Sequence, residues 1–170
     1  MAMTSAMRAL ILAPILKATF LASLGGVATS QPKFEDYPVK EIFRGTPASP
    51  VLSTPETRRF RTELRRQAAT GANFAGHFML ARWGCGAGCV SVAVIDSISG
   101  AVYFAPFSFQ DTIVLIDGKP NSACNHASDF QIDSELFIAQ GEIKEKTGRH
   151  YYRWHDRRFT LVHFEPRCEF

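Results

Sequence analysis

Two cysteines in a glycine-rich loop carry the clearest chemical potential in this chain. Cys85 and Cys89 are separated by Gly86-Ala87-Gly88, and His77 precedes Cys85 by eight residues. A thiolate activated by an imidazole base is a nucleophile, so this pattern is compatible with a thiol-dependent enzyme. The glycines also allow a turn tight enough to bring the two Cα atoms within disulfide range. The loop therefore has a catalytic and a structural interpretation.

The cysteine count favours the structural interpretation. The chain has four cysteines, which allow three pairings, and we expect Cys85–Cys89 and Cys124–Cys168 if the protein is exported. Cys-x-x-x-Cys is a permitted zinc spacing, but no second Cys/His pair stands at the distance that a zinc finger requires. We therefore predict neither a metal nor a cofactor.

The N-terminal 30 residues have the three parts of a secretory signal. Arg8 supplies positive charge, apolar runs follow on both sides of Lys17, and Ala28-Thr29-Ser30 offers a cleavage site. Because Lys17 interrupts the apolar stretch, no continuous membrane span of about 20 residues is present. The sequence predicts a cleaved signal peptide over 1–30 and a periplasmic or secreted protein. An uncleaved anchor and a non-targeting N-terminus remain alternatives.

The charge balance gives no reason to expect a nucleic-acid partner. The whole chain has a formal net charge of +3, but residues 1–30 contain two basic residues and no acidic one. Residues 31–170 therefore have 17 basic and 16 acidic residues and a net charge of +1. A nearly neutral balance gives no general reason to expect nucleic acid or an anionic membrane as partner.

The segment before the main domain is rich in proline. Residues 31–52 contain Pro32, Pro38, Pro47 and Pro50, a spacing that no helix tolerates. We expect an extended segment with a short strand at 40–43.

An amphipathic helix is predicted over residues 53–70. Ser53 or Thr54 can cap the helix, and Glu56 has the capping-box spacing from Ser53. An apolar stripe follows at intervals of four residues. Gly71 is placed to end the helix. Five arginines decorate it, and this surface is either a solvated face or a site for an anion or a partner: Arg58, Arg59, Arg61, Arg65 and Arg66.

Short apolar runs separated by turn residues follow to the end of the chain. This spacing predicts an antiparallel meander of about seven strands, and thus one α+β domain over 53–170. We expect the first two strands to be neighbours at the sheet centre. Asp133, Glu135 and His155 are predicted to be solvated. The predicted strands are 78–83, 89–95, 101–105, 113–116, 136–139, 151–154 and 159–164.

Several of these strings also resemble a known group of proteins. Asn73-Phe74-Ala75-Gly76-His77, Trp83-Gly84-Cys85-Gly86-Ala87-Gly88-Cys89, the turn from Asp96 to Tyr103 and Tyr151-Tyr152-x-Trp154 are similar to a family of small exported bacterial proteins with a WGCGxGC motif. The resemblance covers about residues 40–165. It implies export and a shared architecture, and it implies no activity.

The sequence thus favours an exported, disulfide-stabilised binding domain of the bacterial envelope, without catalytic activity. Its partner would be a protein or another envelope ligand, and the candidate binding residues are His77, Trp83, Gly86 and Gly88. The alternative is a thiol-dependent enzyme that uses Cys85 or Cys89 with His77.

Overall fold

The computed structural model describes residues 30–110, 115–116, 119–120 and 128–166. The chain divides into Met1–Ser30 and Gln31–Phe170, and the helices and strands that the structure describes belong to the second unit. The predicted signal peptide and the predicted Cys124–Cys168 bridge lie outside the described residues and stay predictions.

The region predicted as one helix over 53–70 forms two short helices instead. These are α1, Pro55–Arg59, and α2, Arg61–Ala68, and the chain leaves helical geometry at Phe60 with φ −98° and ψ 16°. Of the two predicted caps, Thr54 is the one that caps α1, because its hydroxyl accepts the Thr57 N–H at 3.1 Å. The break turns the Phe60 ring onto Trp83, with ring centroids 5.0 Å apart.

The predicted antiparallel architecture is confirmed, since each strand pairing within the described residues is antiparallel. One sheet has the order β1-β2-β3-β7-β8-β9, with β6 paired to β7. The expectation that the first two strands form the sheet centre is wrong, because β1 is an edge strand. The strands are β1 Phe78–Gly86, β2 Cys89–Asp96, β3 Val102–Gln110, β4 Leu115–Ile116, β5 Lys119–Pro120, β6 Asp129–Phe130, β7 Leu136–Ile143, β8 Lys146–His155 and β9 Arg158–Pro166.

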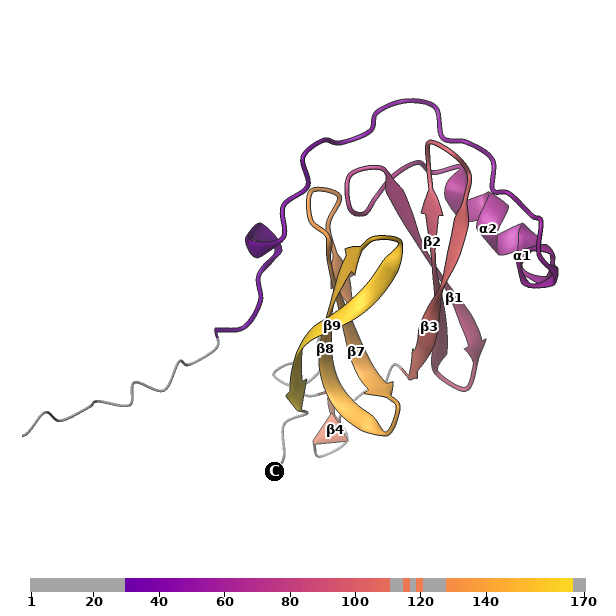
Figure 1. The fold of residues 1–170 in the computed structure, drawn as a ribbon. Helices are drawn as coiled ribbons and strands as arrows, with labels where there is room; N and C mark the ends of the chain where they lie inside the picture. The colour runs from indigo at the N-terminus through magenta and orange to yellow at the C-terminus, as the bar shows by residue number, and fades with distance from the viewer. Residues whose placement is uncertain (1–29, 111–114, 117–118, 121–127, 167–170) are drawn as a thin grey trace, which may run out of the picture. The chain divides into compact units, whose positions relative to one another are not determined.

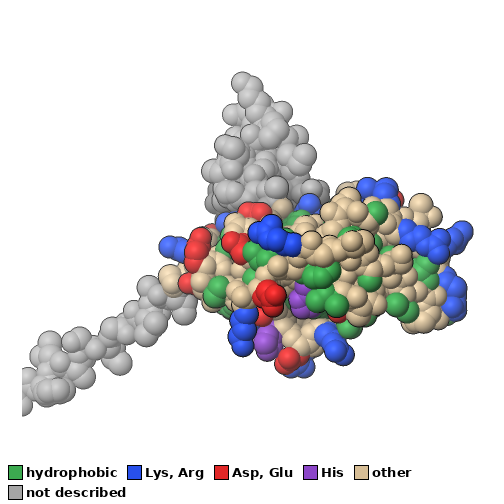
Figure 2. Space-filling model, turned by 90° about the horizontal axis from the view of Figure 1, so that it is seen from above, with side chains coloured by type: hydrophobic (Ala, Val, Ile, Leu, Met, Phe, Trp, Pro, Cys, Tyr) green, Lys and Arg blue, Asp and Glu red, His purple; other side chains and the backbone are tan. Residues whose placement is uncertain are grey.

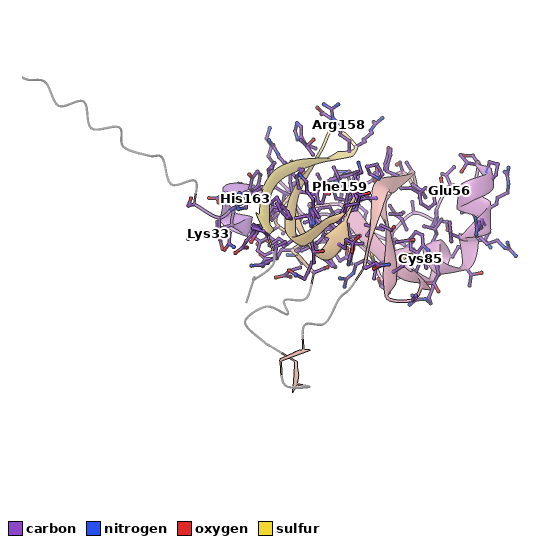
Figure 3. All side chains as sticks on the ribbon, turned by 90° about the horizontal axis from the view of Figure 1, so that it is seen from below. Lys33, Glu56, Cys85, Arg158, Phe159 and His163 are labelled. Atoms are coloured by element: carbon purple, nitrogen blue, oxygen red, sulfur yellow. A yellow bond between two sulfur atoms is a disulfide. The ribbon has the colours of Figure 1, made fainter. Side chains whose placement is uncertain are left out.

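The sheet consists of two antiparallel groups, β1–β3 and β7–β9. A single residue pair, Gln110 with Glu142, joins β3 to β7 in the described residues. Alternate side chains of both groups meet in one apolar core, because successive residues of a strand point to opposite faces. Figure 3 shows Phe159 of β9 among these side chains. The core includes Leu80, Val92, Val94, Phe109, Phe137, Ala139, Tyr152 and Trp154.

The outer faces of the two groups have different covers. Leu64 and Ala68 of α2 pack on Met79, Ala81 and neighbouring side chains of β1–β3. On the other side, a 3₁₀ turn at Phe34–Asp36 brings Phe34 and Tyr37 against a cluster from β7 and β8. Parts of both faces of β1, β2, β7 and β8 are therefore covered, whereas Leu161 and Val162 of β9 remain exposed.

Residues 38–51 form an extended strap over the turns at one end of the strands, visible as the purple arch in Figure 1. Its backbone N–H groups bond to the turns: Phe43 to the Gly76 carbonyl at 3.0 Å and Val51 to the Gly100 carbonyl at 2.8 Å. The short strand predicted at 40–43 is not part of the sheet. These hydrogen bonds link the strap to loops instead of to a strand.

Candidate functional site

The cysteine loop lies at the β1–β2 connection. The structure joins Cys85 to Cys89 by a disulfide, with the Cα atoms 5.0 Å apart, and Figure 3 labels Cys85 there. Gly86 and Gly88 adopt φ of 107° and 79°, where a residue with a side chain would be strained. Both glycines are exposed. The glycines thus allow the tight turn that the bridge closes.

His77 lies at the opposite end of β1 from the cysteines. Phe78, its neighbour, begins β1, and Cys85 follows seven residues later in the same strand. At a rise of about 3.3 Å per residue, the eight residues from His77 to Cys85 place the imidazole on the order of 25 Å from the disulfide. The structure therefore does not bring the imidazole and either sulfur together, and a bridged sulfur is not a thiolate nucleophile.

Trp83 occupies a third place, under the helices. Its half-buried ring lies 5.0 Å from Phe60 and 6.1 Å from Phe104, measured between ring centroids. Its Nε1 atom is buried and has no hydrogen-bond partner among the described residues. Trp83 and Gly84 also border a hollow of about 450 Å³. The four binding candidates named from the sequence therefore do not form one site.

A groove of about 590 Å³ surrounds His77, and we call it the His77 groove. Five segments that are distant in sequence contribute to it, including the strap and the β8–β9 turn. Its volume lies within the range of small-molecule pockets, about 300–1,000 Å³. Its lining residues are Pro38, Val39, Lys40, Glu41, Ala75, His77, Phe78, Asp96, Glu135, Arg153, Trp154, His155, Asp156 and Arg157.

Asp96 is placed in the groove by the β1–β2 register, which sets it opposite Phe78. Its carboxylate accepts the Ile98 N–H at 2.8 Å and the Ser99 hydroxyl at 2.8 Å. Burial raises the pKa of Asp96, but these hydrogen bonds, one from the Ser99 N–H and the nearby His77 together hold the pKa below its ordinary value. Asp96 therefore presents a negative charge beside His77 at neutral pH.

A second carboxylate–imidazole pair lies across the groove at the start of β7 and the end of β8. Glu135 accepts a hydrogen bond from Arg153 Nε at 2.8 Å, and its other oxygen lies 3.6 Å from His155 Nδ1. Asp156 Oδ1 lies 3.6 Å from His155 Nε2. Arg153 and His155 share one face of β8, since side chains two apart in a strand point the same way.

The chemistry available in the groove is acid–base and hydrogen-bonding chemistry. Its lining has two imidazoles, four carboxylates and three basic side chains, but no serine, threonine or cysteine to act as a nucleophile. Of the residues that the structure describes, no three His, Cys, Asp or Glu side chains form a cluster able to hold a metal ion. The groove is thus equipped to bind a polar ligand through both signs of charge.

Sequence reasoning found His77 but missed Asp96, Glu135 and His155 as its companions. Asp96 could have been found, since a hairpin from 78 to 96 places its two ends side by side. The sequence predicts that Glu135 and His155 are solvated, and the structure leaves His155 exposed and Glu135 half-buried. Their meeting depends on the β7–β8 register, which pairs Leu136 with Arg153 and which the sequence does not reveal.

In the described part of the chain, no helix is long and apolar enough to cross a membrane. The resemblance to exported proteins with a WGCGxGC motif stays a prediction. Comparison with known proteins finds no matching family model, no matching curated protein and no matching solved structure.

Proposed function

We propose that this protein is an exported, disulfide-stabilised binding domain of the bacterial envelope and that its ligand occupies the His77 groove. The observation that carries the proposal is the groove itself, whose polar lining comes from five separate chain segments. A site assembled from distant segments is held by the whole fold, and such preorganisation favours binding.

The lining also indicates the chemistry of the ligand. Glu41, Asp96, Glu135 and Asp156 supply negative charge, and Lys40, Arg153 and Arg157 supply positive charge. A ligand with both amine and carboxylate groups would complement such a groove better than a ligand of one sign. The peptide-bearing fragments of a cell wall have this chemistry.

Two observations support export to the periplasm or the medium. Residues 1–30 have the composition of a secretory signal. The Cys85–Cys89 bridge suits an oxidising compartment, because cytosolic thiols are kept reduced. The proposal includes no nucleic-acid partner and no stable membrane span after cleavage of the signal.

Binding of soluble peptidoglycan fragments tests the proposal. Titration of the full chain with these fragments, followed by NMR, should shift the amide signals of residues 77, 96, 135 and 155. Glu135→Gln should weaken the affinity at least tenfold, because it removes the charge paired with Arg153. Glu145→Gln is the matched control, since Glu145 is exposed in the β7–β8 turn, and it should retain wild-type affinity. Absence of binding, or equal losses in both variants, would contradict the proposal.

The redox state of the cysteines tests the export component. Non-reducing mass mapping of protein recovered from the periplasm should find Cys85 linked to Cys89. Free thiols at both positions in that preparation would remove the main support for a disulfide-stabilised exported domain.

A further inference from the structure

The surface formed by α1 and α2 carries a concentration of positive charge outside the His77 groove. Its five arginines are exposed, and Figure 2 shows Lys and Arg side chains gathered on the side where Figure 1 places these helices. We call this surface the arginine face, and it comprises Arg58, Arg59, Arg61, Arg65 and Arg66.

The net charge of the protein is distributed unevenly, with an excess of positive charge on this face. Residues 55–68 contain five arginines and two glutamates, a net charge of +3, whereas residues 31–170 as a whole have a net charge of +1. The rest of residues 31–170 is therefore at −2. Such asymmetry orients a protein in an electric field and attracts one face to an anionic surface.

Few of these guanidinium charges are neutralised within the protein. Arg66 pairs with Glu63 at 2.7 Å, and it is the one arginine of the face that forms an ion pair with a carboxylate in the described residues. Arg58 donates to the Ser53 carbonyl at 2.8 Å, and Arg61 donates to the Arg58 carbonyl at 3.2 Å. Hydrogen bonds to carbonyls fix the position of a guanidinium without cancelling its charge.

The fold directs the arginine face toward solvent. Leu64 and Ala68 are buried against β1–β3, so the opposite side of α2 must point outward. Val51, four residues before the start of α1, is an apolar side chain with 49% of its surface exposed. Basic side chains beside an exposed apolar one are the combination that binds the headgroup region of an anionic membrane.

We propose that the arginine face docks the protein on a membrane surface rich in anionic phospholipid headgroups. Charge complementarity selects this occupant, since an array of guanidinium groups matches an array of phosphates. The inference does not rest on the His77 groove, because the two surfaces share no residue. It adds a site of attachment to the proposed binding domain.

Vesicle cosedimentation tests this proposal with the full chain. Vesicles of equal parts phosphatidylglycerol and phosphatidylcholine should retain the wild-type protein, and pure phosphatidylcholine vesicles should retain at least tenfold less. Raising sodium chloride from 50 to 300 mM should reduce the binding to anionic vesicles at least fivefold, because salt screens exposed charges.

Two triple variants with the same net charge separate the face from overall charge. The first triple variant should lose at least tenfold in affinity for anionic vesicles; it combines Arg59→Gln, Arg61→Gln and Arg65→Gln. The control combines Lys33→Gln, Arg44→Gln and Lys144→Gln, all exposed positions away from the helices, and should stay within threefold of wild type. The affinity of the single variant Arg65→Glu for anionic vesicles should fall at least threefold. This variant keeps the test valid if the triple variant misfolds.

Three outcomes would overturn the proposal. The first is equal retention on zwitterionic vesicles, and the second is an equal loss in both triple variants. The third is an affinity for soluble polyglutamate that matches the affinity for anionic vesicles, since this would identify an acidic polypeptide as the partner instead of a lipid surface.

Discussion

At the scale of single residues, the surroundings of each histidine determine whether it is available to a ligand or only packs in the fold. His77 and His155 lie beside carboxylates in the His77 groove, whereas His150 is buried in the sheet with 2% of its surface exposed. The His150 Nε2–H donates to the Lys146 carbonyl at 3.0 Å, and the ring centroid lies 4.8 Å from that of Phe164. His150 is thus a structural histidine, in contrast to the two in the groove.

His150 should make the stability of the fold depend on pH. Burial lowers the pKa of His150, although hydrogen bonds to the carbonyls of Lys146 and Gly141 act in the opposite direction and the Lys146 charge adds to the decrease. As the pH falls through about 6.5, the unfolded chain takes up a proton that the folded chain does not. The free energy of unfolding should therefore decrease from pH 7 to pH 5, with a slope of up to about 1.4 kcal/mol per pH unit from this residue.

Urea unfolding at pH 5, 6 and 7 measures this effect, and His150→Gln should remove its share of the slope. NMR titration of the wild-type imidazole should place its midpoint below the ordinary value. A midpoint at or above 6.5, or an unchanged slope in His150→Gln, would show that His150 does not carry the pH dependence.

At the scale of elements, the strap depends on a close approach of backbone to backbone. Gly76 has φ of 82°, and a Cβ atom built on it would collide with the Glu41 carbonyl oxygen of the strap. Gly71 has a similar φ of 88° but open space around it. Substituting each glycine by alanine therefore compares backbone strain alone, at Gly71, with strain plus a clash against the strap, at Gly76.

Gly76→Ala should destabilise the fold more than Gly71→Ala. Strain alone should cost about 1–2 kcal/mol at Gly71, and displacement of the strap should add about 1–3 kcal/mol at Gly76. Urea unfolding gives both values, and limited proteolysis should cleave residues 38–48 faster in Gly76→Ala than in Gly71→Ala. Equal costs and equal cleavage would show that the strap does not need the glycine.

The local elements were predictable, but their partners were not. The β-branched run from Val90 to Ile95 predicts β2 well, because the residues that favour a strand all lie within that segment. The sequence does not predict the edge position of β1, because Met79, Leu80 and Ala81 form a continuous apolar run of the kind found in central strands. All three are buried in the structure. The α2 helix buries one face of β1. The edge itself is capped by side chains, since the Arg82 N–H bonds to Gln67 and the Leu80 N–H bonds to Asn73.

For the candidate site, one residue was predicted from the sequence and its companions were not. His77 could be singled out from its neighbourhood in the sequence, but the expectation grouped it with Trp83 and the glycine loop. An extended strand separates residues that are close in sequence by about 3.3 Å per residue, so a short sequence distance did not mean a shared site. The carboxylates of the groove come from segments far from His77 in sequence, and only the fold brings them to it.

At the scale of the whole molecule, side-chain packing holds the two sheet groups together. One residue pair joins β3 to β7 in the described residues, whereas aromatic rings cross the interior between the groups. Phe137 is fully buried, and its ring centroid lies 5.7 Å from Phe159, 6.4 Å from Phe109 and 6.5 Å from Phe130. Phe137 thus connects β7 to rings from β3, β6 and β9.

Phe137→Ala should therefore destabilise the whole fold by about 3–5 kcal/mol, since it removes a buried ring and leaves a cavity. Phe137→Leu should cost less, about 1–2 kcal/mol, and remains measurable if the alanine variant is unfolded. Leu161→Ala is the control, because 47% of Leu161 is exposed, and it should change the free energy by no more than about 0.5 kcal/mol. Urea unfolding followed by both tryptophan fluorescence and far-UV circular dichroism gives these values. We expect the two probes to report one coincident transition in Phe137→Leu, because both groups bury their inner faces in the same core. Separate transitions would show that the two groups unfold independently and that the shared core does not couple them.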